Sequence, residues 1–362
     1  MRGSNLICGV LMSAVWGLQG CASQSDAKDP LPVAPKTEYR LPIPVAWGGE
    51  VRCANSSCAM AAVEHEVGRL VVYKLQKDEG QLQAATKLPY HPDAAKWLSD
   101  DLVAVAVEGS SAVHIYRLNG DALTQLAQIS VGFAPRDVTV VQVTDGKYQL
   151  LATPYSGGQV TWINWSEQSP QAAEVMSQPV CLAPWHPQVM RKEGLGVAQT
   201  TIWVGCLDDR QLMVLTPPAN GQTVPAKSVA RFDAVPRNVA ISPSTDWVYV
   251  ALETGARNAR VQSQTLVRQS VVAPAYGNVS VVVVDEQTVA WGEDGRVVFQ
   301  KLDAAGQVLE ARALKVSGFP TSLQLVDADL DGQQDLVVYN SAGDFVDVLL
   351  GPLWERAAAV TP

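Results

Sequence analysis

The sequence contains little charge and few histidines, and it lacks the short motifs of several enzyme classes. Only 17% of its 362 residues are charged, and the net charge of −9 argues against a nucleic-acid partner, which would need a strongly basic patch. The 4 histidines are isolated in sequence and form no His-Glu-x-x-His pair. Neither a Gly-x-Ser-x-Gly elbow nor a phosphate-cradling glycine loop occurs. Local spacing therefore predicts no catalytic residue.

The first 21 residues are predicted to be a targeting segment. Arg2 is its only early charge, and the apolar stretch from Leu6 to Leu18 is too short to span a bilayer. The segment ends in Leu18-Gln19-Gly20-Cys21, which resembles the lipobox of bacterial lipoprotein signal peptides. The resemblance implies that Cys21 is diacylated and anchors the protein in a membrane. No aspartate follows Cys21, which in a Gram-negative cell implies an outer-membrane lipoprotein facing the periplasm or the cell surface. The alternative is an ordinary secretory signal cleaved nearby.

Four cysteines remain once Cys8 leaves with the signal and Cys21 takes lipid, and they are predicted to form disulfides because their number is even in an oxidising compartment. Cys53 and Cys58 flank Ala-Asn-Ser-Ser and are expected to close a hairpin. Cys181 and Cys206 are expected at the ends of the first and third strands of one repeat, on the same face. The alternative, a metal or haem site at Cys53 and Cys58, lacks both a Cys-x-x-Cys-His motif and a nearby histidine.

A proline-marked pattern recurs along the chain. Its clear copies are 132–140, 233–241 and 317–325, in which Pro135, Pro236 and Pro320 end one strand before an apolar strand of period two. Weaker copies lie near Gly48, Pro92, Pro187 and Tyr276. Seven units of about 40 to 52 residues result, each offering four antiparallel strands, which is typical of a β-propeller. The sequence therefore predicts an all-β, seven-bladed β-propeller, rather than a β-sandwich, which would need no repeat.

Parts of two units are less regular than the others. In the fifth unit the last strand is obscure, and residues 254–270 are predicted to be an insertion. The last unit is predicted to hold all four of its strands, so the ring is expected to close without a swapped strand. The alternative is that residues near Tyr39 supply a swapped strand. The predicted organisation is a signal peptide (1–21), a Pro-rich tether (22–38), the propeller (39–353) and a C-terminal tail (354–362).

Acidic residues crowd into one turn of the last unit, between two apolar runs. In Asp327-Ala-Asp-Leu-Asp-Gly-Gln-Gln-Asp335, carboxylates occupy the first, third, fifth and ninth positions, and a glycine follows the third carboxylate. This is the first half of an EF-hand-like loop, so we expect one structural calcium ion bound by Asp327, Asp329, Asp331, Asp335 and the backbone carbonyl of Gln333. The alternative is a solvated acidic turn.

The same region resembles a known propeller family. The run from Pro320 to Asn340, followed by 347–351, is similar to an FG-GAP/VCBS-type repeat. That resemblance implies a seven-bladed propeller, as in the head of integrin α subunits, with calcium in a loop between two strands of a blade. Residues 235–251 also resemble the YVTN-type propeller repeat. The other units share only the strand pattern, so one calcium ion is implied.

Tryptophans and arginines suggest where a partner binds. Trp162, Trp203 and Trp291 lie on predicted strands and are expected in the core. Trp47 and Trp185 fall in predicted turns around the channel, and Arg136 and Arg237 occupy equivalent places there. Exposed Trp and Arg are enriched at binding hot spots, so these four residues are predicted to form a binding face. The alternative is that the arginines pair with acids between blades.

The functional prediction is a lipid-anchored envelope propeller that binds another envelope protein or a glycan and has no catalytic role. One alternative is a lactonase-like propeller hydrolase with a metal ion in the central channel. Such a site would need acidic, His or Asn side chains converging from several blades. Another alternative is an assembly factor of an envelope complex.

Overall fold

The computed structural model describes residues 37–360, except 55, 195–196, 220 and 275–277. The described residues belong to one compact unit. The predicted signal peptide, Cys21 and nearly all of the predicted tether lie outside them. Among the described residues, no helix combines the length and the apolar character that crossing a membrane requires.

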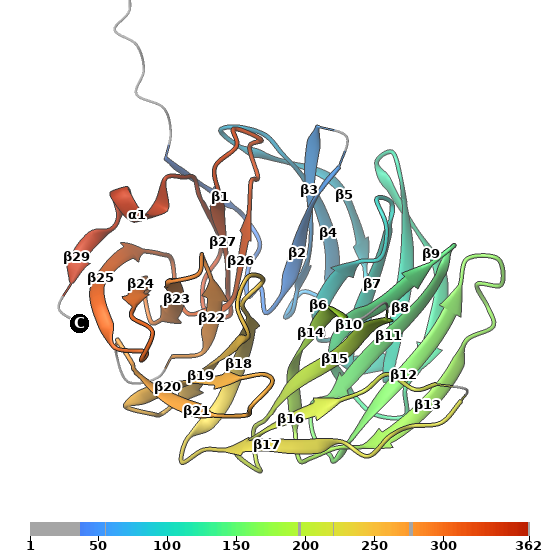
Figure 1. Ribbon diagram of the computed structural model, residues 1–362. Helices are drawn as coiled ribbons and strands as arrows, with labels where there is room; N and C mark the ends of the chain where they lie inside the picture. The colour runs from blue at the N-terminus through green and yellow to red at the C-terminus, as the bar shows by residue number, and fades with distance from the viewer. Residues whose placement is uncertain (1–36, 55, 195–196, 220, 275–277, 361–362) are drawn as a thin grey trace, which may run out of the picture. The chain divides into compact units, whose positions relative to one another are not determined.

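Seven antiparallel sheets form a β-propeller, as predicted (Figure 1). The first strand of each sheet lies toward the middle of the ring and contacts the first strands of the two neighbouring sheets. These inner strands are β2 (Gly49–Ala54), β6 (Pro92–Trp97), β10 (Pro135–Thr144), β14 (Pro184–Gly194), β18 (Val235–Ile241), β22 (Ser280–Val283) and β26 (Pro320–Val326).

The second and third strands of each blade pack between neighbouring blades. The second strands are β3 (Ser57–Glu64), β7 (Leu102–Val107), β11 (Lys147–Pro154), β15 (Val197–Cys206), β19 (Trp247–Glu253), β23 (Thr288–Glu293) and β27 (Asp335–Asn340). The third strands are β4 (Arg69–Leu75), β8 (Ala112–Asn119), β12 (Gln159–Ser166), β16 (Gln211–Leu215), β20 (Arg257–Gln262), β24 (Arg296–Leu302) and β28 (Val346–Leu349). Every residue of β7 is buried, because sheets cover both of its faces.

The outer strands complete the blades. They are β5 (Gly80–Lys87), β9 (Ala122–Ser130), β13 (Glu174–Pro179), β17 (Lys227–Arg231), β21 (Arg268–Val272), β25 (Val308–Lys315) and, in the seventh blade, β1 (Glu38–Leu41). A short 3-10 turn, Glu108–Ser110, follows β7. The predicted core tryptophans Trp162, Trp203 and Trp291 are buried, as expected.

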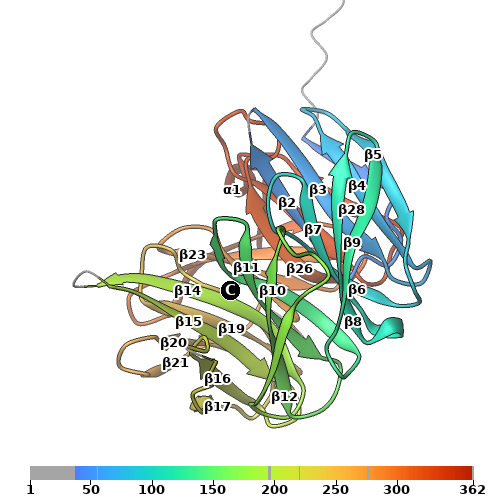
Figure 2. The ribbon, with the colours of Figure 1, turned by 90° about the vertical axis from the view of Figure 1, so that its right-hand side faces the viewer.

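The last blade is completed by the start of the described chain. β1 pairs antiparallel with β28, and Tyr39 and Leu41 are buried in the core between the seventh and first blades. Figure 2 shows the blue strands of the first blade beside the red segments of the seventh. The prediction that the last unit holds all four strands is therefore wrong, and the swapped strand near Tyr39 is the alternative that the structure supports. The segment predicted as a tail includes most of the helix α1 (Leu353–Arg356) and all of β29 (Ala358–Val360), which pairs with β25 as a fifth strand of the sixth blade.

The predicted insertion at 254–270 is also wrong, because β20 and most of β21 lie within it. The polar side chains there misled the sequence interpretation. Arg260 is buried, yet its guanidinium stacks on Trp247 at 4.2 Å and donates to the carbonyl of Ala304 and the side chain of Gln269. A buried arginine is compatible with a strand when its donors are satisfied in this way.

Most inner strands begin with a β-bulge. Register shifts follow Pro92, Pro135, Pro236 and Pro320, and a longer shift lies between Trp185 and Gln188. The fourth inner strand thus starts at Pro184 rather than near Pro187, and the sixth starts at Ser280 rather than near Tyr276, which lies outside the described residues. A bulge leaves one residue unpaired and re-aims its side chain. Asp93, Arg136 and Arg237 occupy these positions.

Both predicted disulfides are present. Cys53 and Cys58 face each other across the β2–β3 hairpin, as expected. Cys181 precedes β14 and Cys206 ends β15, the second strand of its blade, so its predicted place on a third strand is wrong. The bridge still forms because the start of a first strand and the end of the second lie at the same end of a blade.

Candidate functional site

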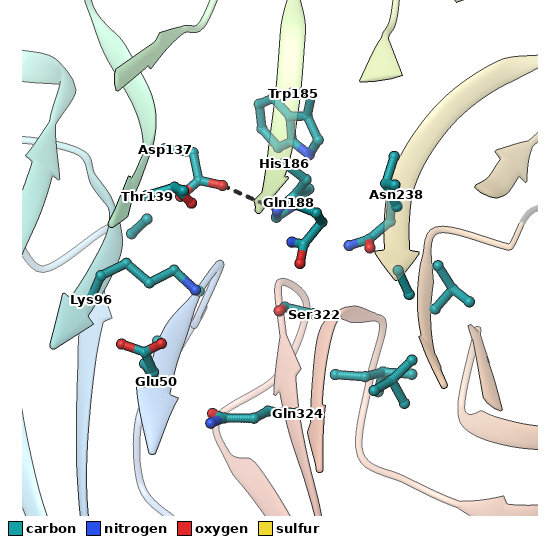
Figure 3. A pocket seen from close by; sticks show the side chains of 18 of the residues that line it. Glu50, Lys96, Asp137, Thr139, Trp185, His186, Gln188, Asn238, Ser322 and Gln324 are labelled. Carbon is teal, nitrogen blue, oxygen red and sulfur yellow. Dashed lines mark ion pairs between the residues drawn. The ribbon is translucent and has the colours of Figure 1, made fainter. Parts of the chain in front are cut away.

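The inner strands surround a cavity of about 400 Å³ at the centre of the ring. Polar and apolar side chains both line it, and Figure 3 shows Glu50, Lys96, Asp137, His186 and Asn238 among the polar ones. His186 Nδ1 lies 3.3 Å from Asp137 Oδ2, the ion pair drawn in the figure. Glu50, on the first blade, is held by the second blade, since its carboxylate accepts a hydrogen bond from the Trp97 backbone amide at 2.6 Å.

We call the end of the ring where the inner strands begin the mouth face. It also carries the connections between blades and the turns from each second strand to the third. The four residues predicted to form a binding face meet there. The guanidinium carbon of Arg136 lies 5.2 Å from the centre of the Trp47 ring and 5.1 Å from that of Trp185, and Arg237 lies 5.1 Å from Trp185. These distances lie within the range of cation–π attraction.

A fifth residue, which the sequence analysis did not identify, belongs to the same group. The ring centre of Tyr155 lies 3.9 Å from the Arg136 guanidinium, from the turn that follows β11. We call Trp47, Arg136, Tyr155, Trp185 and Arg237 the aromatic–arginine cluster.

The alternative expectation, arginines paired with acids between blades, holds for Arg136 but not for Arg237, whose acid belongs to its own blade. Arg136 Nη1 lies 3.0 Å from Oδ1 of Asp93, on the neighbouring blade, and Arg237 Nη1 lies 3.7 Å from Glu253. Burial lowers the pKa of Arg237, an effect that Glu253 opposes and the like charge of Arg136 adds to. Arg136 therefore belongs to the cluster and also forms an ion pair between blades. The two roles are compatible because different parts of the guanidinium make the two kinds of contact.

A row of rings extends the cluster across the first two blades. Trp47 lies 5.8 Å from His65, His65 stacks on His91 at 4.3 Å, and His91 stacks on Tyr90 at 3.5 Å. His65 directly follows β3. Burial alone would lower the pKa of His65, but its hydrogen bond to Asp93 and the charge of that carboxylate raise it above the ordinary value.

The mouth face also exposes large apolar side chains. Tyr90 is 64% exposed and Tyr155 is 50% exposed. Val67 and Leu182 are exposed in turns on the same side of the ring. Trp185, predicted in a turn, instead lies in β14 and is only 6% exposed, and Trp47 is half-buried, so a partner would first meet the two tyrosines.

The acidic turn lies on the opposite face, between β26 and β27. Ligand oxygens of Asp327, Asp329 and Asp335 all lie within 4.8 Å of one another. Asp335 is fully buried, and its two carboxylate oxygens accept backbone hydrogen bonds from Ala328 and Gly351, both at 2.7 Å. Burial raises the pKa of Asp335 and of Asp329. These groups therefore resist ionisation when no cation balances them.

The other two predicted calcium ligands are arranged differently. Asp331 is exposed, and its Oδ1 accepts a hydrogen bond from the backbone amide of Gln333. Its own amide donates to Asp327 and Asp329, which closes the turn. The Cys53–Cys58 disulfide packs under this turn, with Sγ atoms 3.5 and 3.4 Å from the Asp327 carbonyl oxygen. The disulfide thus links the first blade to the acidic turn of the seventh.

Two groups of three potential metal ligands occur among the described residues: the three aspartates, and His65, Glu66 and His91 on the mouth face. Sequence reasoning missed the second group, because its histidines come from turns on two blades and have no characteristic spacing.

Comparison with known proteins finds solved structures that have a similar fold. No protein-family model matches the chain, and no curated protein does. Among solved structures, BBS1N in complex with ARL6DN is similar with a TM-score of 0.60 and 15% identity, over 87% of this chain and 96% of that one. A putative 6-phosphogluconolactonase from Bacteroides fragilis is similar with a TM-score of 0.60 and 13% identity, over 78% of this chain and 87% of that one. At these identities the likeness concerns the fold alone.

Proposed function

We propose that the protein is a non-catalytic binding module, anchored in the outer membrane by lipid on Cys21, whose mouth face docks another envelope protein. The observation that carries the proposal is the convergence of Arg136 and Arg237 on Trp47, Trp185 and Tyr155 at the channel mouth. Incorporation of labelled palmitate, abolished by Cys21→Ser, tests the anchor separately.

The composition of the mouth face suits a protein partner. Trp, Tyr and Arg are the residue types that dominate protein–protein hot spots. Tyr90 and Tyr155 supply large exposed rings, while Arg237 and Glu253 add a charged pair that is 24% and 33% exposed. The similar propeller BBS1N is itself crystallised with a protein, which supports the same class of partner. A glycan, which would stack on the same exposed rings, is the alternative ligand.

The lactonase-like alternative draws support from the likeness to a putative 6-phosphogluconolactonase and from the Asp137–His186 pair in the channel. A metal-dependent hydrolase needs at least three protein ligands around its ion. Within the described residues, no group of three His, Cys, Asp or Glu ligand atoms gathers in the channel. We therefore favour the binding function.

Exposed tyrosines provide the test, because they can be removed without unpairing Arg136 from Asp93. The partner would be captured from detergent-solubilised membranes, identified and purified. A Tyr90→Ala, Tyr155→Ala variant should then weaken binding by about 2 kcal/mol or more, roughly 30-fold in Kd.

The matched control is Val143→Ala with Val267→Ala. These two side chains are 49% and 54% exposed on the opposite face, so their removal should leave Kd unchanged. Equal Kd values for the tyrosine variant and the wild type would refute the proposed face.

We further propose that the acidic turn binds one structural calcium ion through Asp327, Asp329 and Asp335, with Asp331 and the Gln333 carbonyl as further ligands. The support is the close approach of three carboxylates, none of which forms an ion pair with Lys or Arg in the described part of the chain. Oxygen-only ligand sets suit calcium.

Calcium should therefore raise the thermal unfolding midpoint, by an amount equivalent to about 2.7 kcal/mol at a concentration 100 times Kd. Asp329→Asn should abolish this rise. Asp344→Asn should leave it intact, since Asp344 is exposed in another turn of the same blade. A midpoint that is indifferent to both calcium and chelator would exclude the site.

A further inference from the structure

We propose that His65, Glu66 and His91 form a binding site for one divalent transition-metal ion of the zinc class. The three residues come from two turns of the mouth face: His65 and Glu66 directly follow β3, and His91 directly precedes β6. Their ligand atoms all lie within 4.8 Å of one another, and His65 Nε2 lies 3.9 Å from Glu66 Oε1.

Neighbouring acceptors leave the far nitrogen of His65 available for a metal. Its Nδ1 lies 3.2 Å from the Pro92 carbonyl oxygen and 3.3 Å from Asp93 Oδ1. Both neighbours are acceptors, so Nδ1 carries the hydrogen and Nε2 presents its lone pair toward Glu66.

His91 has a similar neighbour. Its Nδ1 lies 3.9 Å from Glu108 Oε2, in the 3-10 turn after β7. A carboxylate hydrogen-bonded behind the imidazole is the usual surrounding of metal-bound histidine, and Asp93 takes this place behind His65. Glu108 lies beyond hydrogen-bond distance of His91 and contributes its charge alone.

The donor set favours zinc over calcium. Two imidazoles and one carboxylate are characteristic of zinc sites in which a fourth position stays open to water or another ligand, whereas calcium takes oxygen donors. The site is accessible, since Glu66 is 60% exposed at its side chain and His91 is 24% exposed. As placed, the two imidazoles stack with their planes 16° apart, so their in-plane lone pairs do not meet at one point and metal binding requires one ring to rotate. The competing interpretation is that the two histidines stack only as part of the row of rings.

Titration of the purified, full propeller with zinc sulfate, followed by calorimetry, tests the site. Excess calcium would be present throughout to occupy the aspartate turn. The wild type should bind one zinc ion. The variants His91→Gln and Glu66→Gln should each bind it more than about tenfold more weakly. Glu108→Gln should weaken the affinity less than either of these changes, because Glu108 acts on His91 through its charge and not through a hydrogen bond.

His186→Gln is the control, because His186 lies in the channel outside the group, and this variant should bind zinc like the wild type. Cobalt substitution adds a direct signal, since visible absorption bands should appear in the wild type and vanish in His91→Gln. Thermal unfolding of each variant checks that the propeller is folded. The inference is overturned if the wild type binds no zinc, or if folded His91→Gln and Glu66→Gln bind it as tightly as the wild type. Neither result would bear on partner binding through Tyr90 and Tyr155.

Discussion

Truncation of Leu41 to alanine tests whether β1 holds the ring closed. Leu41 is fully buried among residues of the first and seventh blades. A Cβ placed on Gly80 would clash with Leu41 Cδ2, so the leucine side chain fills the space directly against the backbone of β5. Removing its three outer carbons forfeits about 2.4 kcal/mol at roughly 0.8 kcal/mol per buried carbon.

The cavity left by the truncation adds to that loss. Because the wall at Gly80 is backbone, it cannot move in to fill the space, and we expect a total cost of about 3 to 4 kcal/mol, within the usual range for buried Leu→Ala changes. Urea unfolding followed by tryptophan fluorescence measures it. Leu82→Ala on the outer strand β5 is the control, since Leu82 is 46% exposed and should cost less than about 0.5 kcal/mol. If the two variants were equally stable, β1 would not be a closing strand.

The remaining predictions concern charge and crosslinks. Because Asp93 raises the pKa of His65 in the folded state, this histidine stabilises the fold below its ordinary pKa of about 6.5, and the contribution is lost as the pH rises through the folded value. The urea concentration at the unfolding midpoint should therefore fall as the pH rises through that range, and it should fall less steeply in His65→Gln than in the wild type. Parallel curves of midpoint against pH for the two proteins would contradict the pairing of His65 with Asp93. Replacing Cys181 and Cys206 by serine opens a loop of 25 residues and should cost roughly 3.5 kcal/mol, against roughly 2 kcal/mol for Cys53 and Cys58, whose separation is 5. Equal costs, measured by urea unfolding, would refute the loop-length argument.

The repeat was predictable from sequence because its signals are local. Prolines at the starts of inner strands and fully apolar second strands are properties of short segments, and they indicated seven blades. The equivalence of Arg136 and Arg237 followed from the same repeat. The structure adds the reason, which is a β-bulge at each position.

Features that depend on distant partners were not predictable in the same way. β1 is only 4 residues long, and its partner β28 lies at the other end of the chain. Asp93 occupies the bulge equivalent to Arg136, but the repeat around Pro92 is too weak to reveal it. His65, His91 and Tyr155 come from separate turns, and only the closed ring brings them together.

The mouth face is tested most directly by placing a photo-crosslinking residue at single positions in cells. Position 155 on the mouth face and position 143 on the opposite face suit the comparison, because Tyr155 and Val143 are exposed to nearly the same extent, 50% and 49%. We predict a covalent adduct with one envelope protein from position 155 and none from position 143. An adduct from position 143 alone, or none from either, would contradict the proposal that this propeller binds its partner across the channel mouth.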